Sequence, residues 1–255
     1  MIKSIKSIIK NRYWDKLMEL QYGRDIVVLF AQDYVYKMLS EVSILDIGLG
    51  KSTDILNIRN SLTRHNDNIP LHMHGLEFYE PNIIHAEKHG ISVHSFDLER
   101  DEMPFEDGSM DIIVMNQVLE HTKEWYCIFK EVNRVLKKDG ICIVGLPNLA
   151  SWHERVRLLL GKHPNCLDAK GPHIRDVVMN NFIQFVEQNS LFKSSKIYGR
   201  YFYGILNYKA NLFFSKLFPA MCVSIFVYLN KIKKGDFTKI LDNNFLETNF
   251  YRGKV

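Results

Sequence analysis

Short apolar runs alternate with longer segments of mixed hydrophobic and polar residues along most of this chain. The runs have the length of buried strands, and several end at an acidic or polar side chain. The expected strands are residues 44–46, 71–77, 91–97, 111–121, 140–148, 192–200 and 221–231. Because helix-length segments separate these runs, the pattern predicts an α/β fold with a doubly wound sheet.

A glycine turn follows the first apolar run. The run stops at Asp46, and Gly48 and Gly50 come before a segment with a helical pattern. Glycines let the backbone approach a ligand closely, and the start of a helix offers free N–H groups. The turn therefore predicts a cradle for a cofactor.

Three enzyme classes use such a turn, and two of them fit this chain poorly. A P-loop NTPase needs a glycine where Leu45 stands, and Asp46 would repel bound phosphates. The dinucleotide-binding fingerprint needs a third glycine where Thr53 stands. The third class, in which acidic residues end successive strands, agrees with the rest of the chain.

From about residue 44 to residue 231 the chain resembles the class I S-adenosylmethionine (SAM)-dependent methyltransferases, especially the small-molecule branch of the methyltransferase 11 and 23 type. The resemblance rests on the glycine turn and on the runs that end at Glu77 and Asp97. It implies a Rossmann-like, doubly wound, seven-stranded sheet that is parallel except for an antiparallel last strand. The expected parts are an N-terminal helical cap (1–42), a methyltransferase domain (43–234) and a C-terminal tail (235–255). The domain is expected to carry acceptor-side insertions at about 148–180 and 200–218. The second insertion is a helical insert before the last strand.

SAM carries two ribose hydroxyls, an adenine amine, an amino-acid tail and a sulfonium cation, which suit carboxylates at strand ends. The resemblance assigns Glu77 to the ribose, and Asp97 with the backbone of Leu98 to the adenine. Asp46 is expected to order the glycine turn or to hold the ligand's ammonium group, and Asn116 to lie near the methionine tail. The other expected cofactor contacts are Gly48, Gly50, Phe78, Gln117, Tyr22 and Arg24. Taken singly, each acid could instead be a solvated strand end or helix cap, and Tyr22 and Arg24 ordinary surface residues.

Methyl transfer from a sulfonium is an in-line displacement, so alignment is the main task of the enzyme. His121 is the first candidate for a general base toward a hydroxyl acceptor, because imidazole titrates near neutrality. Its alternative role is to hold a loop or cap a helix, and His173 is the second candidate base. The expected acceptor-side residues, which suit an anionic or polyhydroxyl acceptor, are Asn148, His153, Arg175, Tyr201 and Tyr203.

A related subgroup, the quinone-pathway O-methyltransferases, holds a metal with an E-x-x-E-H arrangement after the fourth strand. The matching stretch here runs from Gln117 to Glu120 and His121. Because Gln117 stands where the first carboxylate would be, the stretch lacks an anionic ligand of the kind that hard divalent cations prefer. The sequence therefore predicts that no metal is required.

Composition narrows the partner classes. A net charge of +4 without a dense basic stripe disfavours nucleic acid as a substrate, and the run 116–119 reads NQVL rather than the N-P-P-[YF] of base-amine methyltransferases. The four cysteines have no C-x-x-C spacing, so they are expected to be reduced in a cytoplasmic protein. The aromatic segment 201–218, with lysines nearby, leaves open a lid, a dimer surface or peripheral contact with the inner membrane surface. A monomer and a homodimer both remain open.

The function expected from these observations is SAM-dependent O-methylation of a small polar metabolite or a surface-glycan precursor, at a sugar hydroxyl or at a phosphoryl or phosphoramidate oxygen. The glycan assignment, with its link to capsule and polysaccharide biosynthesis, follows from analogy with bacterial relatives of the 23-type branch. Two alternatives stay open: an RNA or DNA methyltransferase, and a SAM-binding scaffold protein without activity.

Overall fold

A computed structural model describes residues 19–37, 41–65, 69–99, 101–167, 171–175, 177–205 and 207–239. Its elements in chain order are η1 (Leu20–Tyr22), α2 (Arg24–Val35), β1 (Val42–Ile47), α3 (Thr53–His65), β2 (Leu71–Glu77), α4 (Glu80–Lys88), β3 (Ser92–Ser95), β4 (Met110–Asn116), η2 (Leu119–His121), α5 (Trp125–Val135), β5 (Leu136–Pro147), α6 (Trp152–Leu159), η3 (Asn165–Leu167), α7 (Met179–Glu187), β6 (Phe192–Arg200), α8 (Tyr208–Leu217), η4 (Pro219–Met221) and β7 (Ser224–Lys231). The first part of the expected helical cap and most of the expected tail lie outside these residues.

All seven strands form one sheet in the order β3-β2-β1-β4-β5-β7-β6. Strands β3, β2, β1, β4 and β5 pair in parallel, whereas β7 pairs antiparallel with both β5 and β6. The expected seven-stranded, doubly wound sheet with an antiparallel last strand is therefore confirmed.

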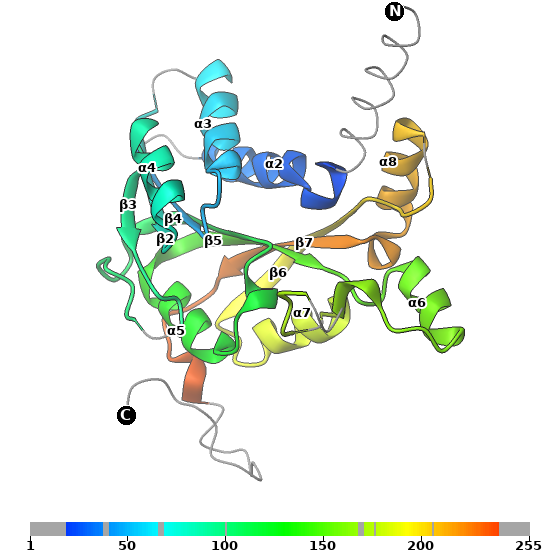
Figure 1. Ribbon diagram of the computed structural model, residues 1–255. Coiled ribbons are helices and arrows are strands. Elements are labelled where there is room, and N and C mark those ends of the chain that lie inside the picture. The colour runs from blue at the N-terminus through cyan, green and yellow to red at the C-terminus, as the bar shows by residue number, and fades with distance from the viewer. Residues whose placement is uncertain are drawn as a thin grey trace, which may run out of the picture.

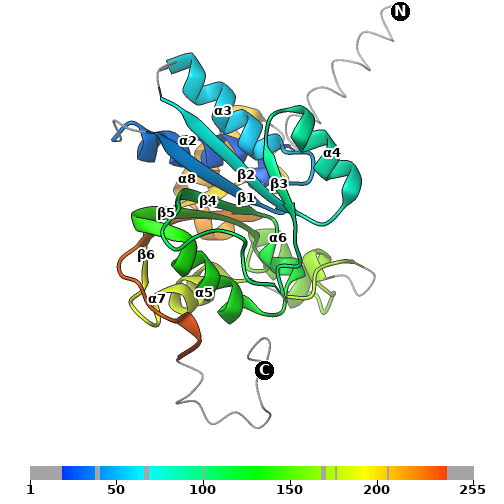
Figure 2. The same cartoon turned by 90° about the vertical axis from the view of Figure 1, so that its left-hand side faces the viewer.

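Helices cover both faces of the sheet (Figure 1), and the view turned by 90° shows the sheet lying between two helical layers (Figure 2). Strand β4 explains why: Ile112 and Val114 point into a core shared with α2 and α3, and Ile113 and Met115 point into a core shared with α5 and α7. A strand buried on both faces appears in the sequence as a continuous apolar run, because every side chain is covered.

Three of the expected strands are shorter than the sequence predicts. The third covers only Ser92–Ser95. The fourth ends at Asn116, because Gln117 has a φ of 58° and turns the chain out of the sheet. The stretch Leu119–His121, expected as strand, forms the 3-10 helix η2. The last strand begins at Ser224, after the 3-10 turn η4.

A buried carboxylate joins the N-terminal cap to the sheet. Asp111 at the start of β4 accepts hydrogen bonds from the Ser43 backbone N–H (2.8 Å) and from the Tyr34 hydroxyl of α2 (3.3 Å). It also pairs with the Lys137 ammonium at 2.6 Å. Four elements thus meet at one side chain that is 1% exposed.

The first residues of the expected C-terminal tail belong to the packed core. Phe237 is fully buried and contacts Phe129 and Phe192, and the Gly235 backbone N–H donates to the Asn133 side chain at 2.9 Å. The core therefore extends past the last strand to at least residue 237.

Candidate active site

A cavity of about 730 Å³ opens where the parallel strands end. Its walls come from the residues that follow β1, β2, β3 and β4, together with the loop before α7. The lining residues are Ile47, Gly48, Gly50, Leu76, Glu77, Phe78, Phe96, Asp97, Leu98, Glu99, Gln117, Val118, His121, Thr122 and Pro172. Eight of the residues predicted from the sequence are among them, and this is the edge at which open α/β sheets bind ligands.

The glycine turn forms one wall of the cavity. Gly48 has a φ of 73°, and a Cβ placed on it would lie 2.7 Å from Val118 Cγ2, so a side chain is excluded there. Gly50 has a φ of 50°, and a Cβ on it would meet nothing within 4 Å. The turn therefore leaves open space beside its backbone, just before the N-terminus of α3.

Glu77 at the end of β2 fastens the turn. One carboxylate oxygen accepts from the backbone N–H groups of Phe78 (2.9 Å) and Tyr79 (3.0 Å). The other accepts from the Gly50 N–H (2.9 Å) and from the Asn82 side chain (3.1 Å). Because a carboxylate offers about four acceptor positions, all of those on Glu77 are in use.

Two further lining residues, Asp97 and Gln117, provide polar groups. Asp97 is exposed and accepts from the Glu99 backbone N–H at 3.0 Å, and Leu98 lies beside it. The side-chain nitrogen of Gln117 is buried and has no hydrogen-bond partner within the described residues. A buried donor without a partner is costly, so its position in the cavity wall suits a ligand that accepts from it.

These observations fit SAM, the cofactor that the fold implies. The open glycine turn, the strand-end carboxylates Glu77 and Asp97, and the unpaired donor of Gln117 match a ligand that has both hydroxyl and amine donors and acceptor atoms.

Four other predicted cofactor residues do not line the cavity: Tyr22, Arg24, Asp46 and Asn116. The Asn116 side chain donates to the Tyr22 carbonyl (2.9 Å) and to Asp54 (3.0 Å). Arg24 pairs with Glu19, lies 4.0 Å from Asp54 and stacks over the Tyr22 ring. In this structure these contacts join the N-terminal cap to α3.

Asp46 is the fourth of these residues and is almost completely buried. Its carboxylate accepts from the Ile55 backbone N–H in the first turn of α3. Burial, and next the neighbouring charge of Asp54, hold the pKa of the Asp46 carboxyl well above its usual range. This placement agrees with ordering of the glycine turn, which was one of its two expected roles.

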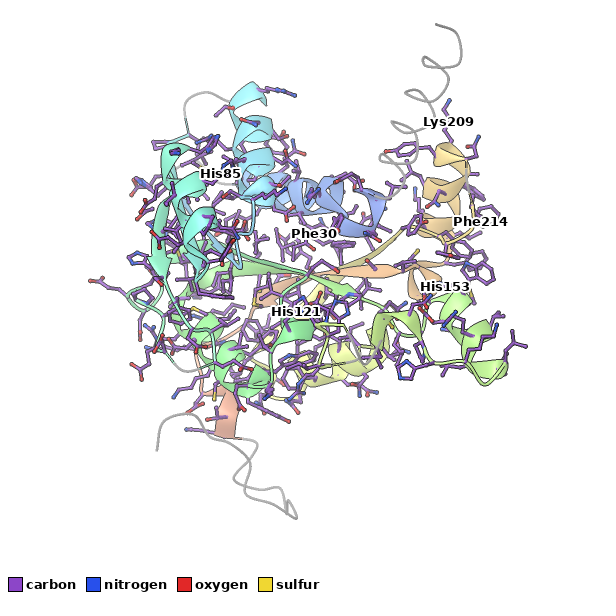
Figure 3. All side chains as sticks on the ribbon, in the orientation of Figure 1. Phe30, His85, His121, His153, Lys209 and Phe214 are labelled. Atoms are coloured by element: carbon purple, nitrogen blue, oxygen red, sulfur yellow. The ribbon has the colours of Figure 1, made fainter. Side chains whose placement is uncertain are left out.

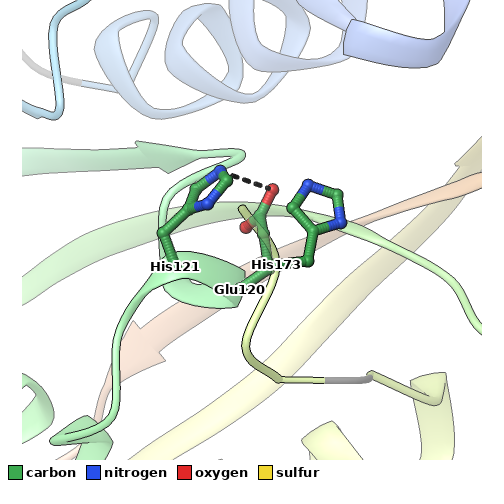
Figure 4. Close-up of side chains that lie close together, drawn as sticks. All are labelled: Glu120, His121 and His173. Carbon is green, nitrogen blue, oxygen red and sulfur yellow. Dashed lines mark ion pairs between the residues drawn. The ribbon is translucent and has the colours of Figure 1, made fainter. Parts of the chain in front are cut away.

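The two candidate bases lie together beside the cavity. The imidazole rings of His121 and His173 are 4.9 Å apart, and the His121 Nε2 atom lies 3.9 Å from a carboxylate oxygen of Glu120 (Figure 4). The loop 172–175 is held there because the backbone N–H groups of Ile174 and Arg175 donate to the Glu120 carbonyl at 2.9 and 3.2 Å. The sequence pattern did not predict this meeting of residues 121 and 173.

Glu120 is a residue that the sequence reasoning did not select for the site. Its side chain is fully buried, and within the described residues neither carboxylate oxygen has a hydrogen-bond partner other than the residue's own backbone N–H. Burial raises the pKa of the Glu120 carboxyl to about 8. The adjacent Glu120 and His121 in the sequence were the available signal, but the sequence does not show that a loop with His173 docks on the Glu120 backbone carbonyl.

The other predicted acceptor residues do not line the cavity. His153 of α6 stacks on Tyr203 at 4.2 Å and lies 3.2 Å from Glu154, at a distance from His121 (Figure 3). Asn148 is buried, and its side chain donates to the carbonyls of Ala220 and Cys222 at 3.0 and 2.8 Å. Its amide is therefore occupied in holding the turn after β5.

Arg175 and Tyr201 have structural contacts as well. The Arg175 guanidinium lies 4.9 Å from the Trp125 ring and donates to the Lys123 carbonyl. Tyr201, with a φ of 63°, packs edge-on against Tyr203. None of the five predicted acceptor-side residues therefore lines the cavity, whereas the candidate base His121 does.

Within the ranges that the structure describes, no helix is long and apolar enough to cross a bilayer. All four cysteines are free thiols; Cys142 and Cys222 are buried, whereas Cys127 and Cys166 are partly exposed.

Comparison with solved structures places the fold among SAM-dependent methyltransferases. A possible histamine N-methyltransferase from Thermotoga maritima is 18% identical, with a TM-score of 0.54 over 89% of this chain and 96% of that one. A SAM-dependent methyltransferase from Archaeoglobus fulgidus is 14% identical, with a TM-score of 0.53 over 82% and 94%. The [4+2]-cyclase SpnF is 16% identical, with a TM-score of 0.54 over 82% and 81%. The expected class I methyltransferase fold is confirmed, although proteins of different activity share it.

Sequence comparison identifies a family. No curated protein matches the chain. The family model described as methionine biosynthesis protein MetW matches residues 31–216, which include the glycine turn and every wall of the cavity. Since this model spans well over half of the sequence, the chain belongs to the methionine biosynthesis protein MetW family.

Proposed function

We propose that this protein is a SAM-dependent methyltransferase that transfers a methyl group to an oxygen of a small polar acceptor. The observation that carries the proposal is the meeting of the open glycine turn, Glu77, Asp97, Gln117 and His121 around one cavity. At about 730 Å³, this cavity has the size of known cofactor and substrate sites.

SAM, when bound, supplies a methyl group on a positively charged sulfur. Gly48 and Gly50 would let the backbone lie against the cofactor, and Asp97 would accept from its adenine amine. Glu77 can accept from ribose hydroxyls only if one of its present donors moves. The Asn82 side chain is the donor that can rotate away, whereas the three backbone N–H groups are fixed by the chain.

His121 is suited to act on the acceptor. Its Nδ1 atom lies 3.1 Å from the Pro172 carbonyl oxygen, which can only accept, so Nδ1 carries the proton and Nε2 keeps its lone pair. The side chain is 38% exposed and lines the cavity. Such a nitrogen can take the proton from an acceptor hydroxyl, an assistance worth about two to four powers of ten in rate.

The proposed acceptor class rests on the sequence analogy and on the family description. Surface-glycan precursors, with sugar hydroxyls or phosphoryl oxygens, are the acceptors proposed from the sequence. The family description adds amino acids related to methionine as a second class to test. Since the [4+2]-cyclase SpnF has the same fold, turnover must be measured and does not follow from the fold.

The test is formation of S-adenosylhomocysteine from SAM by the purified protein. The acceptor panel contains nucleotide-sugars, phosphorylated sugars, amino acids and a short RNA. Turnover with a small acceptor, and a product methyl resonance at an O-methyl shift, would support the proposal. Binding of SAM with no turnover on any acceptor would favour a scaffold protein, and turnover on RNA alone would favour a nucleic-acid enzyme.

Helix α8 supports a further part of the proposal, peripheral contact with an anionic membrane. Phe213 and Leu217 are 63% and 56% exposed. The same helix carries Lys216 and Lys209, the second of which is labelled in Figure 3. Exposed apolar side chains beside lysines suit an anionic lipid surface. Flotation with phosphatidylglycerol vesicles tests it: binding should weaken in Phe213→Ser, and no flotation of the wild type would refute it.

A further inference from the structure

Glu120, His121 and His173 form a cluster of metal-ligand type beside the cavity. One potential ligand atom of each residue lies within 4.8 Å of the other two. A carboxylate oxygen of Glu120 lies between the two imidazole rings (Figure 4). We propose that these three side chains bind a divalent transition-metal ion of the Zn²⁺ class.

The tautomers of both histidines are set for this role. His121 Nδ1 lies 3.1 Å from the Pro172 carbonyl oxygen, and His173 Nδ1 lies 2.8 Å from that of Cys166. A carbonyl only accepts, so each Nδ1 must carry the proton and each Nε2 must carry a lone pair. Metal-bound histidines in proteins commonly donate their second N–H to a backbone carbonyl in this way.

The carboxylate of Glu120 provides an independent observation. Its side chain has no exposed surface, and within the described residues neither oxygen has a hydrogen-bond partner other than the residue's own backbone N–H. The single ion-pair contact of this carboxylate among those residues is to His121, at 3.9 Å. A buried carboxylate is costly unless a cation or donors compensate it, and an ion bound to the two imidazoles would supply that compensation.

The donor set selects the class of ion. Two imidazole nitrogens and one carboxylate oxygen suit Zn²⁺ and similar transition metals, whereas Mg²⁺ prefers oxygen ligands and retains its waters. Ligand atoms of a tetrahedral zinc site lie about 3.3 Å apart, as bond lengths near 2.0–2.1 Å require. Small side-chain rotations therefore suffice to bring the three residues to coordination distance.

The site would have an open position toward the cavity. Glu120 is buried, whereas His121 is 38% exposed and lines the cavity, so an ion between them would face the space where an acceptor would lie. Catalytic zinc sites have this arrangement of three protein ligands and an open position. An ion there would hold the acceptor's oxygen and make its hydroxyl more acidic, so that a solvent water could take the proton in place of His121, whose Nε2 lone pair would be on the ion. This role, though not the ion's binding, rests on the proposed function.

The sequence predicts no metal because Gln117 replaces the first carboxylate of the E-x-x-E-H arrangement. The fold adds a ligand that the arrangement does not contain: His173 reaches the same place from a loop 53 positions after Glu120 in the chain (173 − 120). Because of this added histidine, a metal ion is expected here although the sequence predicts none.

Metal binding can be measured without any enzyme assay. The full-length protein is stripped with a chelator and titrated with Zn²⁺ against a chromophoric competitor, and with Co²⁺ while the visible absorption is recorded. One equivalent of Zn²⁺ should bind, Co²⁺ should give the d–d bands of a four- or five-coordinate site, and Mg²⁺ should not compete. In Glu120→Gln and His173→Ala the Zn²⁺ affinity should fall by about a hundredfold or more, beyond the range of outer-shell changes.

The matched control is His85→Ala, which breaks an exposed pair of histidines, His85 and His89, whose rings are 4.5 Å apart. Its Zn²⁺ affinity should equal that of the wild type. Loss of binding in this control with retention in His173→Ala would show an exposed site and overturn the inference, as would an absence of stoichiometric Zn²⁺ binding by the wild type. SAM titrations on the same samples separate the two proposals: SAM binding without Zn²⁺ binding refutes only the metal site, and the reverse result refutes only the cofactor assignment.

Discussion

Replacing Glu77 by glutamine should weaken SAM binding about a hundredfold. The carboxylate accepts four hydrogen bonds, two on each oxygen, and the substitution turns one oxygen into an NH₂ group that cannot accept. A hydrogen bond to a charged group contributes roughly 1.5–3 kcal/mol, so losing two costs at least about 3 kcal/mol. In the complex the lost acceptor would otherwise serve the Gly50 N–H of the turn and a ribose hydroxyl, so this cost falls on the bound state, and about 3 kcal/mol corresponds to about a hundredfold change in Kd.

Isothermal titration with SAM and with S-adenosylhomocysteine measures this effect. The matched control is Glu80→Gln, the same chemical change at an exposed position in the first turn of α4, and it should leave Kd within about twofold of the wild type. Circular dichroism confirms that each variant is folded. A change of less than about threefold in Glu77→Gln, or an equal loss in the control, would show that Glu77 does not support cofactor binding.

Three further substitutions test other parts of the account. Asp111→Ala leaves the Ser43 N–H and the Lys137 ammonium without their acceptor. The free energy of unfolding, measured by urea titration, should therefore fall by about 3–5 kcal/mol, and a loss below about 1 kcal/mol would contradict this. Asp46 has a raised pKa in the folded state, so its contribution to stability is present at acid pH and is lost as the pH rises. The Tm of Asp46→Asn should therefore exceed that of the wild type increasingly as the pH rises above about 4, whereas a difference independent of pH would refute the assignment. His121→Ala should lower kcat by about two to four powers of ten while the Kd for SAM changes less than about threefold, and unchanged turnover would remove His121 from the chemistry.

The sequence was sufficient for the sheet and for one side of the site. Parallel strands bring their carboxyl ends to one edge, so residues at strand ends, such as Gly48, Glu77 and Asp97, could be placed together without knowledge of any loop.

The parts that were missed depend on side chains meeting across long loops. Asn116 and Arg24 were expected at the cofactor, but Asp54 lies between them and engages both. The approach of His173 to Glu120 depends on backbone hydrogen bonds that dock the loop 172–175 on η2. No periodicity in the sequence encodes such a path, because loop residues carry no repeating constraint.

The cavity at the strand ends should bind SAM. A crystal structure of the protein grown with saturating S-adenosylhomocysteine is the most direct test of this binding. The account predicts density for the nucleoside between the glycine turn and Asp97, with the ribose at Glu77 and the Asn82 side chain rotated away. Crystals that show the cavity empty at saturating ligand, or the ligand bound at another surface, would contradict it.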